Sequence, residues 1–214
     1  MKKLSALFLA ALLTPFAASA ALINGSFETP GIGSGFAPVG PGDPSIVGWT
    51  VIGSHVLLIH DTYTEPGLAF SAQHGDQSLD LTGLGNAGFG GVQQSVATTA
   101  GATYTLTFFV GNQDDSKPNY TLDSAVNLFI DGSLMGTFVN PNSTPGDLNW
   151  LQFTFPVIAA SNSTTIAFVS ATPPGDNMAG LDNVSFTAVP EPGTLALMGA
   201  AFAALGLSRR RKDA

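Results

Sequence analysis

The amino-acid sequence predicts an all-β protein whose central part is a two-sheet antiparallel sandwich. Three observations lead to this class: short runs of alternating apolar and polar residues recur, helical periodicity is almost absent between the chain ends, and turns rich in Gly, Pro, Asn and Asp separate the runs. In Ala102–Val110, for example, Tyr104, Leu106 and Phe108 alternate with threonines. Alternation gives each strand one apolar face, and two sheets bury such faces by packing together.

About ten short strands are expected in the central part of the chain. In order they are Gly48–Ile52, His55–Ile59, Ser78–Leu81, Gly91–Ala97, Ala102–Val110, Ala125–Ile130, Gly136–Val139, Leu151–Val157, Thr165–Ser170 and Val184–Thr187. Turns such as Asp131-Gly132 separate them. Ile32–Ser45 is dense in Gly and Pro, which predicts a long surface loop.

Residues 1–20 have the layout of a secretory signal peptide. Lys2 and Lys3 precede an apolar run, Leu4–Leu13, and Ala18-Ser19-Ala20 supplies the small side chains that signal peptidase accepts. Cleavage is therefore predicted after Ala20. The alternative is a retained membrane helix, but the run is short against the roughly 20 residues that a span needs.

Residues 189–214 predict a tail held in a membrane. Pro190-Glu191-Pro192 precedes a 14-residue apolar stretch, Thr194–Leu207, and a basic end follows at Arg209–Lys212. The prolines fix where the helix begins. The basic end is expected on the cytoplasmic side by the positive-inside rule. The stretch is short for a membrane helix, so only the order of motif, helix and basic end supports this prediction.

That order resembles the PEP-CTERM sorting signal of Gram-negative bacteria. The residues that carry the resemblance are Pro190, Glu191, Pro192, the Thr194–Leu207 helix, Arg209, Arg210, Arg211 and Lys212. The resemblance implies export, a transient stay in the inner membrane through a single C-terminal helix, and processing by exosortase. It also implies delivery to the cell envelope, surface or matrix, in the setting of exopolysaccharide production and biofilm formation.

The part between the two ends, residues 21–188, is strongly acidic. It holds thirteen Asp and Glu side chains, and Lys117 is its only Lys or Arg, which gives a net charge of about −12 compared with −8 for the whole chain. Such a surface repels phosphate backbones, so nucleic-acid binding is not expected. The chain has no cysteine, which excludes disulfides and thiolate chemistry and leaves the core, or a metal ion, to hold the domain together.

Five short motifs occur along residues 21–188 in a fixed order. They are Asn24-Gly25-Ser26-Phe27-Glu28, Gly48-Trp49, Gln77-Ser78-Leu79-Asp80-Leu81, Gln93-Gln94 ahead of Gly101 and Tyr104, and Gly180-Leu181-Asp182-Asn183-Val184. Their order resembles the galactose-binding-like jelly roll of the DUF642 and choice-of-anchor families, which are similar to carbohydrate-binding modules. The resemblance implies a jelly roll whose first and last strands meet, often around a structural calcium ion.

The same resemblance implies two calcium ligands, Glu28 and Asp182. Calcium takes six to eight oxygen ligands, of which carboxylates and backbone carbonyls are the usual ones. These two residues lie far apart in the sequence, so a shared ion would tie the ends of the domain together. The alternative is that Asp182 caps a turn and Glu28 is solvated.

Sugar binding is the second candidate activity. A sugar site stacks an aromatic ring on the pyranose and adds a few amide or carboxylate hydrogen bonds. Trp49 and Trp150 sit among apolar strand residues and are expected in the core. The polar surroundings of the other candidates favour exposure: Tyr63, Gln93, Gln94, Asn112 and Tyr120.

No catalytic motif is apparent. His55, His60 and His74 accompany neither a G-x-S-x-G nucleophile motif nor an H-E-x-x-H helix. We therefore expect a non-enzymatic, exported β-sandwich with a structural or adhesive role, acting through polysaccharide binding. The alternative is a secreted hydrolase acting on polysaccharide, with Glu28 and Glu65 as a conceivable acid–base pair.

Overall fold

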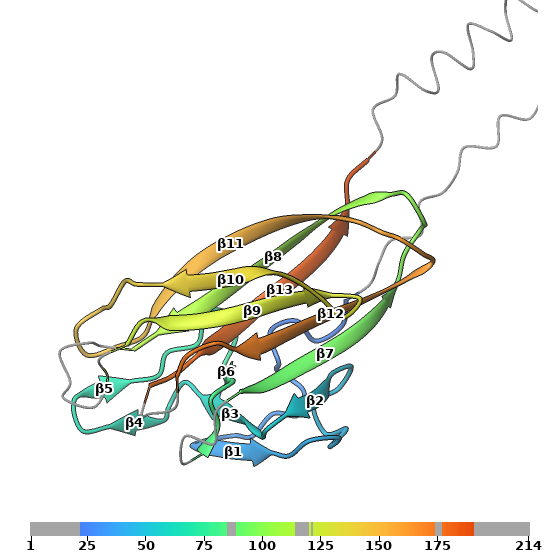
Figure 1. Ribbon diagram of the computed structural model, residues 1–214. Coiled ribbons are helices and arrows are strands. Elements are labelled where there is room, and N and C mark those ends of the chain that lie inside the picture. Colours follow the sequence, from blue (N-terminus) through green and yellow to red (C-terminus); the bar gives the residue numbers. More distant parts are fainter. Residues whose placement is uncertain (1–21, 85–88, 114–119, 121, 174–176, 191–214) are drawn as a thin grey trace, which may run out of the picture. The chain divides into compact units, whose positions relative to one another are not determined.

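The computed structural model describes residues 22–84, 89–113, 120, 122–173 and 177–190 (Figure 1). All the strands belong to one compact unit, Ala18–Val189. The predicted signal peptide lies outside the described residues, and so does the tail beyond Pro190, with its predicted membrane helix and basic end. Within the described part of the chain, no helix is long and apolar enough to cross a membrane.

Two antiparallel sheets pack face to face to form the unit (Figure 1). One has the order β1-β3-β6-β13-β8-β11 and the other β10-β9-β12-β7-β2. The bounds are β1 Phe36–Val39, β2 Thr50–Gly53, β3 Val56–His60, β6 Gln77–Asp80, β7 Gly90–Ala97, β8 Thr103–Asn112, β9 Ser124–Ile130, β10 Ser133–Asn140, β11 Asn149–Ile158, β12 Ser163–Ser170 and β13 Gly180–Ala188. The strands from β6 to β9 alternate between the sheets, and so do those from β10 to β13, as in a jelly roll. The predicted all-β sandwich is confirmed.

Alternation along the strands builds the core between the two sheets. Tyr104, Leu106, Phe108 and Val110 are all fully buried there. Phe108 lies at the centre of an aromatic group, with ring centroids 4.9 Å from Phe168 and 5.1 Å from Phe138. Sheet faces patterned in this way form one continuous apolar layer, which is the main source of stability for a domain without disulfides.

Two parts of the sequence prediction were wrong or incomplete. Ile32–Ser45 is not wholly a loop, because Phe36–Val39 forms strand β1 and pairs with Val56–Ile59 of β3. A two-stranded hairpin, β4 Thr64–Glu65 and β5 Leu68–Ala69, was not anticipated. Periodicity reveals neither, since β1 contains a proline and each hairpin strand has only two residues.

Strand β3 is apolar on both faces, unlike the single-faced strands that alternation predicts. Val56 and Leu58 point into the core between the sheets, whereas Leu57 and Ile59 belong to a second apolar cluster. The other buried members of that cluster are Leu68, Phe70, Leu148 and Met178. Leu68 lies in the β4–β5 hairpin and Phe70 directly follows it. The hairpin therefore covers part of the outer face of the six-stranded sheet.

The N-terminal motif joins the first residues of the domain to the last strand. Phe27 is fully buried, and Asn24 adopts a left-handed conformation (φ 53°) while its side-chain amide bonds the backbone of Thr29. Gly25 accepts the Val184 N–H at 2.8 Å, and a Cβ atom there would lie 1.9 Å from the Val184 carbonyl oxygen. Only glycine permits this approach. The N-terminal motif therefore meets the last strand, but the expectation that the first and last strands meet was wrong, because β1 pairs with β3.

The same substitution, Ile→Ala, should have different effects on stability at a buried position and at an exposed position. Ile166→Ala on β12 empties a fully buried position and should lower the free energy of unfolding by about 2–5 kcal/mol. Ile158→Ala on β11, where the side chain is 72% exposed, should cost less than about 1 kcal/mol. Denaturant unfolding measures both. Equal losses would contradict the assignment of β12 to the core.

Candidate functional site

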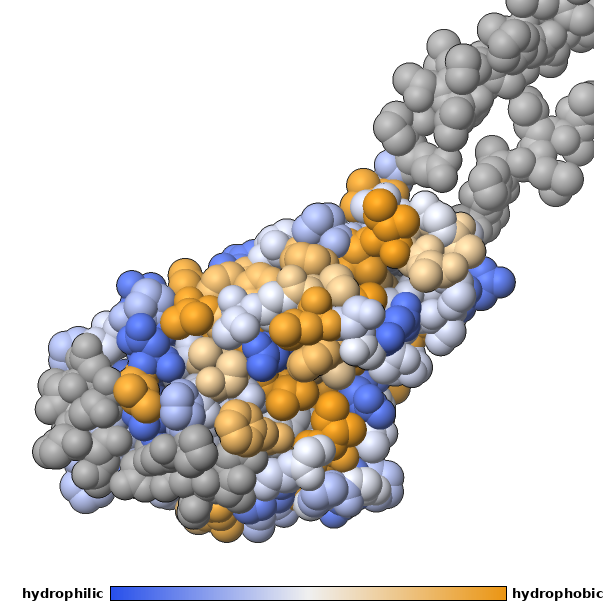
Figure 2. All heavy atoms as spheres, viewed as in Figure 1, coloured by the Kyte–Doolittle hydropathy of each residue, from blue (hydrophilic) through white to orange (hydrophobic). Residues whose placement is uncertain are grey.

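A cavity of about 340 Å³ lies where the β4–β5 hairpin meets the outer face of the six-stranded sheet. Its wall combines aromatic, aliphatic, acidic and amide side chains: Phe36, Leu57, Ile59, Tyr63, Glu65, Phe70, Asp80, Thr82, Leu84, Gln113, Tyr120, Asn177 and Met178, together with Gly83. An apolar wall with a few convergent polar groups is the usual composition of a ligand site in proteins. The domain face drawn in Figure 2 mixes apolar and polar side chains.

Glu65 is held between two tyrosines. The hydroxyl of Tyr63 donates to Glu65 Oε1 at 3.1 Å, and the hydroxyl of Tyr120 donates to Oε2. Burial, and after it the charge of Glu65, raises the pKa of the Tyr63 hydroxyl. The Tyr63 ring also packs against Phe36 and Phe70, with centroid distances of 5.2 and 5.1 Å. The aromatic wall and the carboxylate are therefore fixed relative to each other before any ligand arrives.

Asp80 is a buried acid on the same wall. Its carboxylate accepts the Thr82 N–H at 2.9 Å, the Thr82 hydroxyl at 2.7 Å and the Ala179 N–H at 3.1 Å. Burial raises the pKa of Asp80, although these hydrogen bonds oppose the shift. Asp80 ends β6, and its position opposite Gly180 of β13 fixes it to the centre of the sheet.

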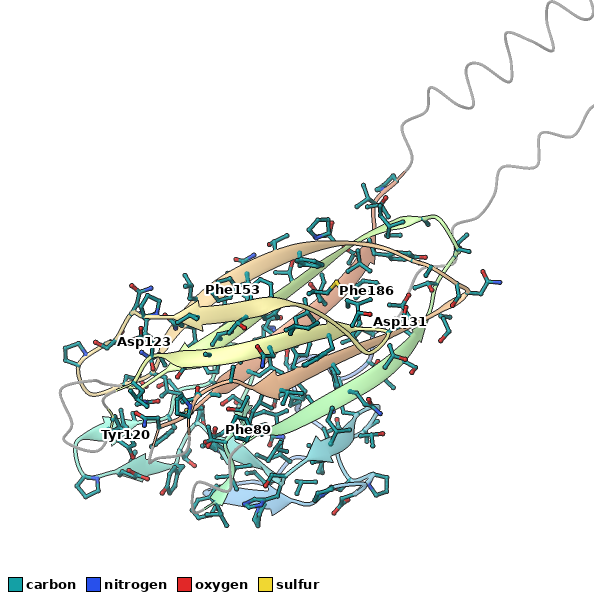
Figure 3. The ribbon with its side chains drawn as sticks, in the orientation of Figure 1. Phe89, Tyr120, Asp123, Asp131, Phe153 and Phe186 are labelled. Carbon is teal, nitrogen blue, oxygen red and sulfur yellow. The ribbon has the colours of Figure 1, made fainter. Side chains whose placement is uncertain are left out.

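An amide pair, Gln113 and Asn177, lines the cavity. Gln113 accepts the Met178 N–H at 2.9 Å, and its own amide donates to Asn177 Oδ1 at 3.3 Å. Asn177 Oδ1 also accepts the Leu122 N–H at 3.0 Å. Figure 3 shows Tyr120 and Asp123 at the same end of the sandwich.

The structure brings together two of the five predicted sugar-binding residues, Tyr63 and Tyr120, in the cavity. Gln93 is half-buried on β7 and lies outside the cavity wall. The expected exposure of Gln94 and Asn112 was wrong. Gln94 bonds the backbone N–H and carbonyl of Ile23, and Asn112 bonds Ser124 and Asn142, so both side chains are occupied within the protein.

Most of the polar residues of the cavity wall were not predicted from the sequence. Asp80, Gln113 and Asn177 were not assigned to a site, and Glu65 was considered only as a possible catalytic group. Asp80 lies within the Gln77–Leu81 motif, which was the one available signal. Trp49 is 2% exposed, as expected of a core residue, and Trp150 is half-buried against the second apolar cluster, donating to the Ser71 carbonyl.

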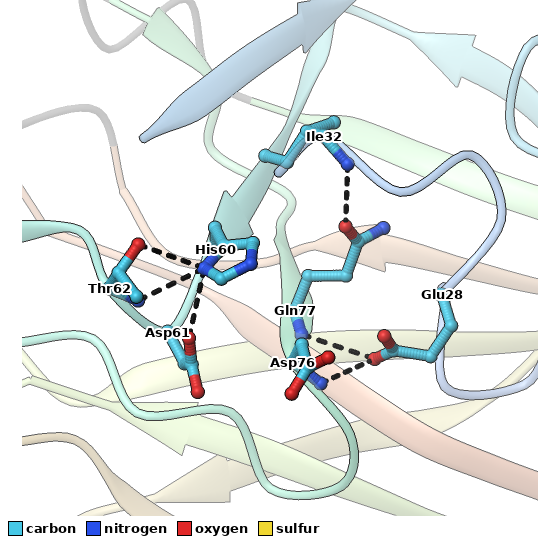
Figure 4. Close-up of polar contacts among 7 residues, drawn as sticks. All are labelled: Glu28, Ile32, His60, Asp61, Thr62, Asp76 and Gln77. Carbon is cyan, nitrogen blue, oxygen red and sulfur yellow. Dashed lines mark hydrogen bonds and ion pairs between the residues drawn. The ribbon is translucent and has the colours of Figure 1, made fainter. Parts of the chain in front are cut away.

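The two predicted calcium ligands lie close to one loop, residues 73–77. A β-bulge in β13, with Asn183 at φ 48°, follows Asp182. Asp182 is fully buried and accepts the N–H groups of Gln73 and His74, each at 2.9 Å. Glu28 Oε1 accepts the N–H groups of Asp76 and Gln77, each at 3.1 Å (Figure 4).

This pair of acids fits part of a calcium site. Burial raises the pKa of Asp182 to about 7 against the backbone hydrogen bonds from His74, Asn183 and Gln73, and the charge of Glu28 adds to the rise. Each carboxylate has about four lone-pair positions, so oxygens that accept N–H groups can still bind a cation. Among the described residues no three His, Asp or Glu side chains gather in a metal-binding group. Backbone carbonyls or water would have to supply the remaining ligands.

The histidines and the conceivable acid pair do not form one catalytic group. His60 Nδ1 lies 2.9 Å from Asp61 and from the Thr62 hydroxyl (Figure 4), and His74 pairs with Ser26. Glu65 lines the cavity, but Glu28 holds the 73–77 loop and is not part of the cavity wall. Of the sorting motif only Pro190 lies within the described residues.

These features define an antiparallel β-sandwich with an aromatic and acidic cavity on one outer face. The chain belongs to the DUF642 family, described as a protein of unknown function, whose model matches residues 20–186. Residues 188–212 match the PEP-CTERM protein-sorting motif, which implies an exported protein processed by exosortase. Both family resemblances noted in the sequence are confirmed. No curated protein matches the sequence.

Several solved structures share a distant likeness to this chain. The CBM22-1 xylan-binding domain of Xyn10C from Paenibacillus barcinonensis is 15% identical, with 72% of this chain and 91% of that chain covered and a TM-score of 0.44. A CBM35 from the same organism is 14% identical, with 72% and 99% covered and a TM-score of 0.39. The C-terminal domain of EclA, a sugar-binding protein, is 17% identical with a TM-score of 0.36; the match covers 44% of this chain and 64% of that domain, less than two thirds of its length.

The raised pKa of Asp182 predicts how the stability of the metal-free protein depends on pH. Between its ordinary pKa of 3.8 and about 7, the folded state keeps a proton that the unfolded state has released. The free energy of unfolding should therefore fall as pH rises through this window, and Asp182→Asn should flatten that fall. Denaturant unfolding in chelator between about pH 4 and pH 8 measures it. The same slope in both proteins would show that Asp182 does not titrate in this range.

Proposed function

We propose that the domain is a non-catalytic glycan-binding module that attaches this exported protein to extracellular polysaccharide. The observation that carries the proposal is the cavity in which Tyr63 and Tyr120 clamp Glu65. Rigid aromatic rings beside fixed hydrogen-bonding groups are what a pyranose requires, since its faces are apolar and its edges carry hydroxyls. The role in the envelope or matrix of a Gram-negative bacterium is then structural or adhesive.

In this proposal the sorting tail directs the protein out of the cell, and the cavity binds the glycan there. Exosortase processing delivers the domain outside the inner membrane, where it meets exopolysaccharide rather than cytoplasmic ligands. The acidic surface of residues 21–188 keeps the delivered domain soluble. A role in biofilm formation follows from attachment to the matrix.

Binding should depend on the aromatic wall of the cavity. Tyr120→Ala removes one ring and one partner of Glu65, and should weaken glycan binding by about tenfold or more, which is ~1.4 kcal/mol. Phe89→Ala is the matched control, since Phe89 is 55% exposed and is not part of the cavity wall. A glycan array followed by titration calorimetry of the bound glycan measures both. Equal binding by the two variants would place the glycan elsewhere.

A polysaccharide hydrolase is the second candidate, because Glu65 and Asp80 both line the cavity. Paired carboxylates on either side of a sugar are the usual equipment of such enzymes. Release of reducing sugar from a bound glycan, lost in Glu65→Gln, would replace the binding proposal with this one.

Calcium binding by Glu28 and Asp182 belongs to the same proposal, as a structural ion that ties the N-terminal segment to β13. Its support is the pair of acids at one loop and the burial of Asp182, which raises the pKa of that carboxyl group to about 7. Neither acid lines the cavity, so the ion would act on stability and not on the sugar.

Chelator should lower the melting temperature of the protein, and Glu28→Ala should remove the difference between calcium and chelator. At a calcium concentration of 100 times Kd, the ion would add about 2.7 kcal/mol. Glu65→Ala is the matched control, since it removes a glutamate from the cavity and should keep the full calcium response. Melting curves that coincide with and without chelator would rule the site out.

A further inference from the structure

The acids that line the cavity face no lysine or arginine among the described residues, because the chain's seven Lys and Arg all lie outside them. Glu65 and Asp80 supply two carboxyl groups to one wall. His55, which interacts electrostatically with Asp80, accepts the Leu84 N–H at its Nε2 atom at 2.6 Å. The charge interaction with His55 lowers the pKa of Asp80, against the rise that burial causes.

Hydrogen bonds within the protein use side-chain hydrogens of four residues of the wall. The side chains that donate theirs to protein acceptors are Tyr63 and Tyr120 (to Glu65), Thr82 (to Asp80) and Gln113 (to Asn177 and Leu122). A phenol has one hydrogen, so each tyrosine oxygen can only accept from a ligand. A carboxylate has no hydrogen to donate, so Glu65 offers a ligand only the lone pairs that the two tyrosines leave unused. This part of the wall selects ligands that donate hydrogen bonds, and leaves ligand acceptors unpaired.

Aromatic rings share the cavity wall with these acids. Phe36, Tyr63, Phe70 and Tyr120 all line the cavity, and the first three are in ring contact through Tyr63. A ring face attracts a cation through its quadrupole, most strongly where water is excluded. An ammonium group has three hydrogen-bond donors and no acceptor, so it matches both the rings and the acceptor-rich wall.

We propose that the cavity selects glycans by charge, taking a sugar that carries a protonated amine in preference to a neutral sugar and excluding uronates. This inference rests on the proposed glycan binding and names the class of sugar. The ammonium would lie between Glu65 and Asp80, with the pyranose against the aromatic wall. A uronate would place a third carboxylate beside these two without a described lysine or arginine to balance it.

The test compares sugars that differ only in the charged group. Glucosamine, glucose and glucuronate, with the corresponding galacto sugars, are titrated into the full-length chain and followed by ligand-observed NMR at slightly acid pH. In at least one series the amino sugar should bind on the order of tenfold tighter than the neutral sugar, and the uronate should not bind. Added salt should reduce the difference in affinity between the amino sugar and the neutral sugar.

Two variants locate the effect. Glu65→Gln should bring the amino sugar and the neutral sugar to within about twofold, because it removes the charge and keeps the size of the side chain. Asp131→Asn removes one charge at the other end of the sandwich from Tyr120 (Figure 3) and keeps a residue that tolerates the left-handed turn there (φ 49°), so it should leave the gap unchanged. The melting curve of each variant verifies that it folds.

The outcomes separate this inference from the function on which it rests. A neutral sugar bound as tightly as its amine counterpart, a bound uronate, or a preference that survives Glu65→Gln would overturn charge selection and leave glycan binding intact. Absence of binding to these sugars, when the glycan array yields a ligand, would also overturn charge selection alone. If the array yields no ligand, both proposals fail.

Discussion

Burial of β3 on both faces is the constraint on which the architecture depends. Val56 and Leu58 anchor the core between the sheets, while Leu57 and Ile59 form the base of the second cluster and line the cavity. Each such side chain contributes roughly 1.5–3 kcal/mol when fully buried. Because the outer face of β3 is apolar, the β4–β5 hairpin has to cover it, and the cavity lies at the edge of that cover.

Among the described residues, the acidic side chains are held by hydrogen bonds from backbone N–H groups and hydroxyls, and not by ion pairs with lysine or arginine. Asp182, Glu28 and Asp80 each accept two or more hydrogen bonds from backbone N–H groups, and His60–Asp61 is the ion pair present among the described residues. Such bonds orient the carboxylates without cancelling their charge. Burial raises the pKa of Asp182 and of Asp80 against these hydrogen bonds. The cations that we propose for these acids are a calcium ion at Glu28 and Asp182 and an ammonium group at Glu65 and Asp80.

The candidate site shows where local sequence is informative and where it is not. Tyr63 and Tyr120 were identified because they stand among polar residues, and both reach the cavity. Gln94 and Asn112 stand in comparably polar surroundings, yet their side chains bond the backbone of segments distant in sequence. Local polarity predicts that a side chain needs a hydrogen-bond partner. It does not predict whether that partner is water, a ligand or the protein itself.

The sequence by itself determined the fold class, ten of the thirteen strands, the family and the sorting tail, because alternation and ordered motifs are properties of neighbouring residues. Only the tertiary structure decided that Glu28 and Asp182 meet at one loop, that β3 is covered on both faces, and that Glu65 and Asp80 share a wall with two tyrosines. Those facts depend on which strands pair across long stretches of chain. Pairing is set by the summed burial of all strands, which no local pattern contains.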